Sequence, residues 1–185
     1  RVWSAFNILG KGKFAYEDGV SLVEKDSYDY VDYAMGHNPA NNMPLWIKPA
    51  GKVSVKDVAD VMRDHYEGTP MDMTQDIGAG GNALPYRWRP MGFTYDGKEY
   101  TNERAIATQQ TAFWFVGQSR GNYPDVLGGI IWFGTDDAAT SYVTPIYTNS
   151  EIVPECFREG NGDMLTYSST SSFWLNNRVA NACYK

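Results

Sequence analysis

Residues 63–70 bring together an unusual number of charged, aromatic and turn-forming side chains. They read Arg-Asp-His-Tyr-Glu-Gly-Thr-Pro, and a glycine-rich stretch then leads to Tyr-Arg-Trp-Arg-Pro at residues 86–90. His65, beside Asp64, could act as a general base. We favour the alternative, in which a histidine in the last turn of a helix interacts with the terminal carbonyls and the helix dipole. We therefore interpret this stretch as scaffold that positions the loop after it.

Neither cysteine has the sequence context of a catalytic nucleophile. Cys156 follows Pro-Glu and has no cationic neighbour before Arg158 that would favour the thiolate. Cys183 falls on the apolar face of a predicted helix, so we expect it in the core. The two cysteines could form one disulfide or none. Because no Ser/His/Asp or Cys/His constellation is convincing either, we predict that this chain holds no catalytic residue.

Several polar side chains could instead bind a substrate. Arg87 and Arg89 flank Trp88 and share one face of an extended segment, so their guanidiniums could bind a substrate carboxylate bidentately. The alternative is a pair of surface or aspartate-paired arginines, and Arg104 has the same two interpretations. The predicted substrate-binding candidates are Asn82, Arg87, Arg89, Arg104, Gln110 and Asp136.

Two of these candidates lie beside a residue of the same type. Gln109 and Gln110 are expected to point to opposite faces of a strand, so at most one of them faces any given pocket. Asp136 and Asp137 are most simply explained as turn residues. A carboxylate pair for acid/base catalysis would need a second, separate partner, and the sequence identifies none.

Cofactors and charged partners are not expected. His37 and His65 are spaced unlike any zinc motif, so we predict no metal site. The loop at residues 78–82 lacks the Lys-Ser/Thr tail of a phosphate-binding loop, and we predict no cofactor. The net charge of -6 and the absence of a Lys/Arg block argue against nucleic acid and anionic membranes. No apolar run reaches the ~20 residues of a membrane span, which predicts a soluble protein.

The elements that position these residues predict an α+β fold. Residues 1–9 form a short helix, and residues 14–53 have loop chemistry. A helix over 54–67 begins at Ser54, with Asp57 as a capping-box acid, and ends before Gly68. Segments 105–117, 128–134 and 141–147 predict an antiparallel meander. A last helix begins within residues 168–172 and carries Leu175, Val179, Ala182 and Cys183 on one side.

The chain is long enough, at 185 residues, and hydrophobic enough, at 43%, for one domain with a sizeable core. Its aromatic content of 15%, with 6 Trp and 13 Tyr, suits either a thick β core or an exposed binding surface, and the core is favoured.

Four motifs in register resemble the N-terminal-nucleophile (Ntn) cysteine dipeptidases of the bacterial dipeptidase A type. They are residues 63–70, residues 86–90, Gln-Gln-Thr at 109–111, and Trp-Phe-Gly-Thr-Asp-Asp-Ala-Ala-Thr-Ser at 132–141. The likeness covers most of residues 45–148 and, more loosely, both flanks. It implies an αββα sandwich, of which this chain would hold an antiparallel sheet with packed helices. It also implies an N-terminal cysteine nucleophile whose own α-amino group is the base.

This chain departs from that pattern because it starts at Arg1 and has no cysteine nearby. Self-cleavage before Thr69 or Thr135 could create another nucleophile, but these residues fit a helix end and a turn better. The first segment begins without a capping residue, and the last helix has no stop signal. We therefore expect an internal piece of a longer hydrolase. Within it we expect an irregular arm (1–53), a family-like core (54–148), and a connection with a terminal helix (149–185).

The expected function is that of a portion of a cysteine-type dipeptidase that is inactive alone. Its expected partners are a small peptide substrate and the remainder of its own polypeptide. The alternative is a non-catalytic, aromatic-rich module that binds carbohydrate or peptide. The sequence leaves cytoplasm, periplasm and secretion equally open.

Overall fold

The computed structural model describes residues 1–87, 92–101 and 104–184, and it is organised around a three-stranded antiparallel sheet. Its strands are β5 (Phe113–Ser119), β6 (Gly129–Thr135) and β7 (Thr144–Tyr147), in that order. Phe115 pairs with Phe133 across β5 and β6, and Ile131 pairs with Ile146 across β6 and β7. The predicted meander and the α+β class are confirmed. The first strand starts eight residues later than predicted, however, because residues 105–112 form turns and coil.

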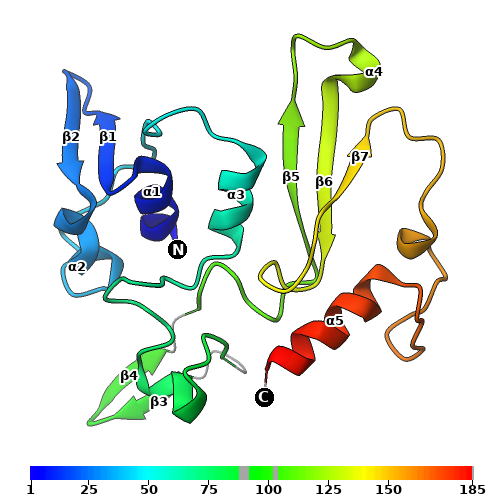
Figure 1. The fold of residues 1–185 in the computed structure, drawn as a ribbon. Helices are drawn as coiled ribbons and strands as arrows, with labels where there is room; N and C mark the ends of the chain where they lie inside the picture. Colours follow the sequence, from blue (N-terminus) through cyan, green and yellow to red (C-terminus); the bar gives the residue numbers. More distant parts are fainter. Residues whose placement is uncertain (88–91, 102–103, 185) are drawn as a thin grey trace.

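One face of the sheet packs against α3 (Val55–Met62). Trp114 and Val116 of β5 join Ala59 of α3 in a buried cluster, with Ala138 from the loop after β6. In Figure 1, α3 lies between the sheet and α1 (Val2–Gly10), so helix, helix and sheet follow one another across the molecule. This cluster fixes the position at which α3 delivers the chain to residues 63–67.

Helix α3 begins as predicted and ends early. The Ser54 hydroxyl accepts a hydrogen bond from the Asp57 N–H, and the Asp57 carboxylate accepts one from the Ser54 N–H, which completes a capping box. The helix ends at Met62, so the prediction that it continues to residue 67 was wrong. Residues 63–67 carry side chains that bond to other segments, and Tyr66 takes a positive φ of 67° that a helix cannot contain.

The N-terminal segment is more regular than predicted. It contains a hairpin of β1 (Lys13–Glu17) and β2 (Leu22–Asp26), then η1 (Ser27–Tyr30) and α2 (Val31–Ala34), where the sequence predicted loop chemistry. The hairpin leaves most of its side chains exposed, so no clean alternation marks it in the sequence. A cluster of Trp3, Phe14 and Tyr30 holds it to α1.

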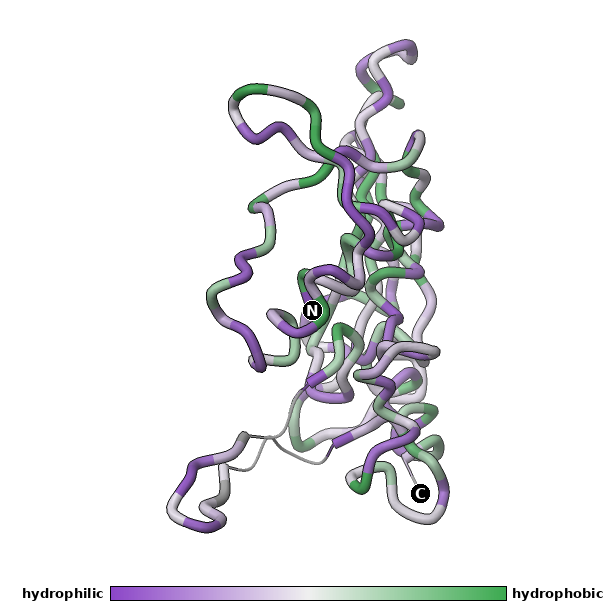
Figure 2. Tube along the Cα trace, turned by 90° about the vertical axis from the view of Figure 1, so that its left-hand side faces the viewer, coloured by the Kyte–Doolittle hydropathy of each residue, from purple (hydrophilic) through white to green (hydrophobic). Residues whose placement is uncertain are grey.

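The remaining elements are short, except for the last helix. They are η2 (Ile77–Asn82), β3 (Gly92–Tyr95), β4 (Lys98–Thr101), α4 (Asp125–Gly128), η3 (Glu155–Phe157) and α5 (Ser172–Cys183). The loop predicted at residues 78–82 is thus part of η2, and Asp76 caps the start of η2 because its carboxylate accepts the Ala79 N–H. The β3–β4 hairpin projects from the rest of the chain in Figure 2. Among the described residues, no helix is long and apolar enough to span a membrane.

Helix α5 starts where the sequence predicted but is rotated about its axis. The residues that face the protein are Ser172, Asn176 and Ala180. The Asn176 amide donates to the Thr135 hydroxyl at 3.0 Å, and the hydroxyls of Ser172 and Thr135 lie 2.9 Å apart. The predicted inward face is exposed instead, which corrects the placement of Cys183 in the core. Polar bonds to the end of β6 set the orientation of this helix, and hydropathy alone does not reveal them.

The capping box predicts a stability cost for Ser54→Ala. Loss of the hydroxyl leaves the Asp57 N–H without its partner, and replacing a serine cap by alanine costs about 1 kcal/mol. Urea denaturation of the variant should show this loss in the free energy of unfolding. Ser150→Ala is the control, because the structure gives the Ser150 side chain no described hydrogen bond, and it should leave the midpoint unchanged. Equal midpoints for both variants would contradict the capping role.

Candidate functional site

The guanidinium of Arg63 joins the end of α3 to the loop after β6. Its Nε donates to the Ala138 carbonyl at 2.9 Å, and its Nη2 donates to the Ser141 carbonyl at 3.2 Å. The guanidinium carbon lies 5.2 Å from the centre of the Trp114 ring, within cation–π range. The Trp114 indole N–H in turn donates to the Ser141 hydroxyl. The start of residues 63–67 is therefore anchored on the buried face of the sheet.

Asp64 and Tyr66 fix the same segment on its other side. Asp64 Oδ2 accepts the Ser4 hydroxyl of α1 at 2.5 Å, and Oδ1 accepts the Tyr66 N–H. Burial raises the pKa of the Asp64 carboxyl, and the bond from Ser4 opposes that shift. The Tyr66 hydroxyl, on a fully buried ring, donates to the Arg104 carbonyl at 2.6 Å. These contacts support the scaffold interpretation of the segment.

His65 pairs with Glu67 and not with Asp64. Its Nδ1 lies 3.0 Å from Glu67 Oε1, and its backbone N–H donates to the other Glu67 oxygen at 2.8 Å. The imidazole is buried, and its Nε2 has no hydrogen-bond partner among the described residues. The ring meets Tyr86 edge-on, with centroids 5.5 Å apart. The predicted helix-terminal role of His65 was wrong, because the residue lies beyond the helix.

Asp136 and Asp137 are both buried, and Asp137 takes part in the turn after β6, as the sequence predicted. Asp137 Oδ1 accepts the Ala139 N–H, while one carboxylate oxygen of each aspartate lacks a described hydrogen-bond partner. Burial raises the pKa of the Asp136 carboxyl, and a hydrogen bond from the Asn177 side chain on α5 opposes it. Burial also raises the pKa of the Tyr86 hydroxyl, and the negative charge of Asp137 beside it adds to the effect.

These contacts define a buried polar cluster of His65, Asp136 and Asp137, together with the half-buried Tyr86. Two carboxylates with unpaired oxygens attract a positive group or a proton, because isolated buried charges are costly. The atoms that lack a partner are enclosed, so the cluster can hold its surroundings in place.

Arg87 closes the loop that leads into this cluster. Its guanidinium donates to the carbonyls of Leu84 and Met73, each at 3.0 Å, and pairs with the Asp76 carboxylate. The side chain is 9% exposed. A Cβ at Gly78 would collide with this guanidinium, so a larger residue there would displace the Arg87 side chain from its bonds. The aspartate-paired arrangement, one of the two alternatives for Arg87, is thus the observed one.

Of the other predicted candidates, the structure brings Gln110 to the backbone of Arg87. Asn82 and the Arg104 side chain are exposed on separate segments, and Arg89 lies outside the described residues. Gln110 is exposed, and its amide donates to the Arg87 carbonyl at 3.3 Å. The amide of Gln109 donates to the same carbonyl, so the prediction that the two glutamines point to opposite faces of a strand was wrong. Their segment is coil and turn, where strand alternation does not apply. Contact between any candidate and a substrate stays a prediction.

Sequence reasoning missed Tyr86, a member of the cluster, and two side chains that bond to the cluster: Glu67, which bonds to His65, and Asn177, which bonds to Asp136. His65 and Glu67 are two residues apart, so their side chains share a face only if the segment is extended. Because the sequence predicted a helix here, their contact was not expected. Asn177 belongs to a helix about 40 residues after Asp136, and no pattern in the sequence connects them.

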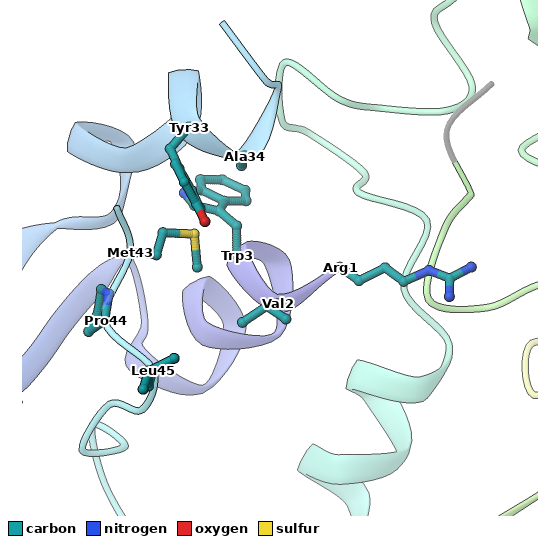
Figure 3. Close-up of a pocket in the computed structure, with 8 residues that line it drawn as sticks. All are labelled: Arg1, Val2, Trp3, Tyr33, Ala34, Met43, Pro44 and Leu45. Atoms are coloured by element: carbon teal, nitrogen blue, oxygen red, sulfur yellow. The ribbon is translucent and has the colours of Figure 1, made fainter. Parts of the chain in front are cut away.

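A separate cavity of about 610 Å³ opens between α1, α2 and the segment at residues 43–45. Figure 3 shows Trp3, Tyr33, Met43 and Leu45 around it, while the Arg1 side chain extends away. The lining is largely apolar and includes none of the predicted site residues. In the described part of the chain, no group of His, Cys, Asp and Glu is arranged to hold a metal ion.

Comparison with known proteins gives consistent matches. The profile described as Peptidase family C69 matches residues 1–185. The chain is 26% identical to probable dipeptidase B of Lactococcus lactis subsp. lactis over 144 residues, 77% of this chain and 26% of that protein. It is 26% identical to a probable dipeptidase of Latilactobacillus sakei, over 76% of this chain and 25% of that protein. It is also 26% identical to probable dipeptidase A of Streptococcus pyogenes serotype M3, over 72% and 24% respectively. No solved structure matches the chain.

The buried carboxyl of Asp136 predicts a pH-dependent effect of Asp136→Asn. Because folding raises the pKa of this carboxyl, its favourable contribution is fully present below the unfolded pKa of about 3.8 and is lost as the pH rises through the folded value. Asparagine cannot ionise, so the variant lacks this loss. We expect the urea midpoint of the variant, relative to that of wild type, to be higher at pH 7 than at pH 4.

Asp125→Asn serves as the matched control, because Asp125 is exposed and its carboxyl makes no described hydrogen bond. Its midpoint relative to wild type should not change between the two pH values. If the urea midpoints of Asp136→Asn and wild type differ by the same amount at both pH values, the inference that a charged Asp136 destabilises the folded protein is contradicted.

Proposed function

The chain belongs to peptidase family C69, and from that premise we propose that it is part of a dipeptidase that hydrolyses small peptides. The observation that carries the proposal is the family match over all 185 residues. Relatives named probable dipeptidases support the substrate class. The chain spans about a quarter of the length of the curated relatives it matches, so the activity is proposed for the whole protein.

The nucleophile in this proposal is a cysteine at the N-terminus of the longer protein. Cys156 is half-buried and Cys183 is exposed, and both are free thiols. Neither thiol has a hydrogen-bond or ion-pair partner within the described residues, although a reactive cysteine needs a nearby base or cation. These observations support a nucleophile outside the 185 residues and an inactive isolated chain.

The substrate candidates divide by exposure. Arg87 and Asp136 are enclosed by their own contacts, which suits positioning residues. Asn82, Arg104 and Gln110 present side chains at the surface, which suits direct contact with a peptide. The sheet with α3 on one face is what one half of an αββα sandwich would contain. The comparisons favour this enzyme over the alternative of a non-catalytic aromatic binding module, because the family match covers the whole chain.

Activity assays test the proposal directly. The full-length protein should hydrolyse unmodified dipeptides and lose that activity when its N-terminal cysteine is replaced by alanine. The 185-residue chain alone should show no turnover, since it lacks the nucleophile. Turnover by the isolated chain, or full activity of the cysteine variant, would contradict the assignment of the nucleophile. Failure of the full-length protein to cleave any dipeptide would contradict the substrate class.

Arg104→Ala tests one substrate contact in the full-length protein. If the exposed guanidinium binds the substrate carboxylate, its loss should raise KM about tenfold, since that factor corresponds to ~1.4 kcal/mol of binding. Arg158→Ala removes the same charge from another exposed position and should leave KM unchanged. Equal kinetics of the two variants would remove Arg104 from the site.

A further inference from the structure

Another cavity, of about 430 Å³, lies along α5, and none of the predicted site residues lines it. One stripe of the helix contributes Trp174, Asn177, Arg178 and Asn181, whose spacing of i, i+3, i+4 and i+7 places them on one face. Tyr167, from the loop that precedes α5 in Figure 1, completes the lining. We call this cavity the α5 pocket. Its volume lies in the range of small-ligand sites.

The aromatic wall of the α5 pocket is held in place by its own loop. The Tyr167 and Trp174 rings meet edge-on, with centroids 5.7 Å apart. The Trp174 indole N–H donates to the Asp163 carbonyl at 3.1 Å. The Asp163 carboxylate accepts the backbone N–H groups of Leu165 and Thr166, which fixes the turn before Tyr167. An apolar ligand group can therefore pack on these rings with little loss of side-chain freedom.

Two amide side chains of the α5 pocket orient each other. The Asn181 Nδ2 donates to the Asn177 carbonyl at 2.8 Å and to the Asn177 Oδ1 at 2.9 Å. The Asn177 side chain in turn donates to the buried Asp136 carboxylate. Both NH₂ groups thus donate within the protein, while the Asn181 Oδ1 accepts no hydrogen bond from the described residues. That oxygen can accept an N–H from a ligand.

Arg178 supplies the charge of the α5 pocket. Its side chain is exposed and has no hydrogen-bond or ion-pair partner in the part of the chain that the structure describes. Arg63 and Arg87, in contrast, bond to backbone carbonyls, and Arg87 also pairs with a carboxylate. A guanidinium without a partner, beside aromatic rings, suits a carboxylate, which it can bind through two parallel N–H···O bonds.

We propose that the α5 pocket binds the carboxylate end of a peptide. Arg178 binds the terminal carboxylate, the Asn181 Oδ1 accepts the N–H of the same residue, and the side chain of that residue packs on the Tyr167 and Trp174 rings. A C-terminal residue carries these three groups together. A neutral sugar would also pack on the rings, but it would leave the guanidinium without a counter-charge. The inference goes beyond the proposed function, because it assigns a binding site that the family match does not identify.

Binding of a matched pair of probes tests the inference. N-acetyl-L-phenylalanine and its C-terminal amide differ only in the terminal charge, and neither is turned over by full-length protein whose N-terminal cysteine is replaced by alanine. Ligand-observed NMR titrations of that protein should give a Kd at least tenfold lower for the acid than for the amide. Arg178→Ala should remove this preference, since a tenfold change corresponds to ~1.4 kcal/mol. Arg178→Lys, which keeps the charge, should restore part of it.

Lys52→Ala is the matched control, because it removes a positive charge from an exposed position on the segment before α3. It should leave both Kd values unchanged. Equal binding of the acid and the amide would overturn the inference. A preference that survives Arg178→Ala but disappears in Arg104→Ala would also overturn it and assign the carboxylate to Arg104. Tighter binding of maltose than of the acid would assign the pocket to carbohydrate instead.

Kinetics of the protein with its cysteine intact identifies the source of the carboxylate. A tenfold rise in the KM for a dipeptide on Arg178→Ala would assign the carboxylate to the substrate, whereas an unchanged KM would assign it to a peptide that is not cleaved. The binding measurement needs no turnover, so it separates the two proposals. A preference for the acid in a protein without dipeptidase activity overturns the function and leaves the site, while activity without the preference does the reverse.

Discussion

The guanidinium of Arg63 ties the end of α3 to the loop after β6, and the arrangement of the site depends on that bond pair. Hydrogen bonds to charged groups contribute about 1.5–3 kcal/mol each, more than a typical neutral bond. The guanidinium also covers the Trp114 ring in the buried cluster. Because the Arg63 side chain bonds to two carbonyls of one loop, it fixes the positions of both the helix end and the loop relative to the sheet.

Once Arg63 is fixed, the next four residues must leave the helix. Asp64 bonds to α1, Tyr66 bonds to the Arg104 carbonyl, and His65 turns toward Glu67 and Tyr86. The backbone N–H groups of His65 and Tyr66, which a continued helix would bond to carbonyls, donate instead to the carboxylates of Glu67 and Asp64. The result is a rigid turn that joins the N-terminal unit, the sheet and the loop of Arg87.

The buried polar cluster adds a cost that the scaffold must offset. Burying carboxylates with unpaired oxygens is unfavourable, and such groups persist where the surrounding packing holds them in place. The Asn177 side chain of α5 donates a hydrogen bond to the Asp136 carboxylate and so offsets part of this cost. The same helix exposes an apolar flank formed by Leu175 and Val179.

The sequence by itself determined the class of fold and its strongest local elements. The α3 capping box follows from Ser54 and Asp57, because the bonds lie within one turn, and the meander follows from short connections between apolar strands. The family resemblance was also evident from the sequence, because motifs are recognised by their residue types and spacing, without knowledge of their contacts. Helix α1 was visible because its apolar spacing is regular.

Only the tertiary structure decided where α3 ends, which side of α5 faces inward and what Asp136 touches. In each case a bond between residues 40 or more positions apart outweighs local preference: Arg63 with Ser141, Asn176 with Thr135, Asn177 with Asp136. The β1–β2 hairpin was missed for a related reason, since its strands are held by pairing and by Phe14 rather than by an alternating pattern. The spacing of residues along the chain predicts contacts within one turn or strand. It does not predict contacts between segments that become neighbours only when the chain folds.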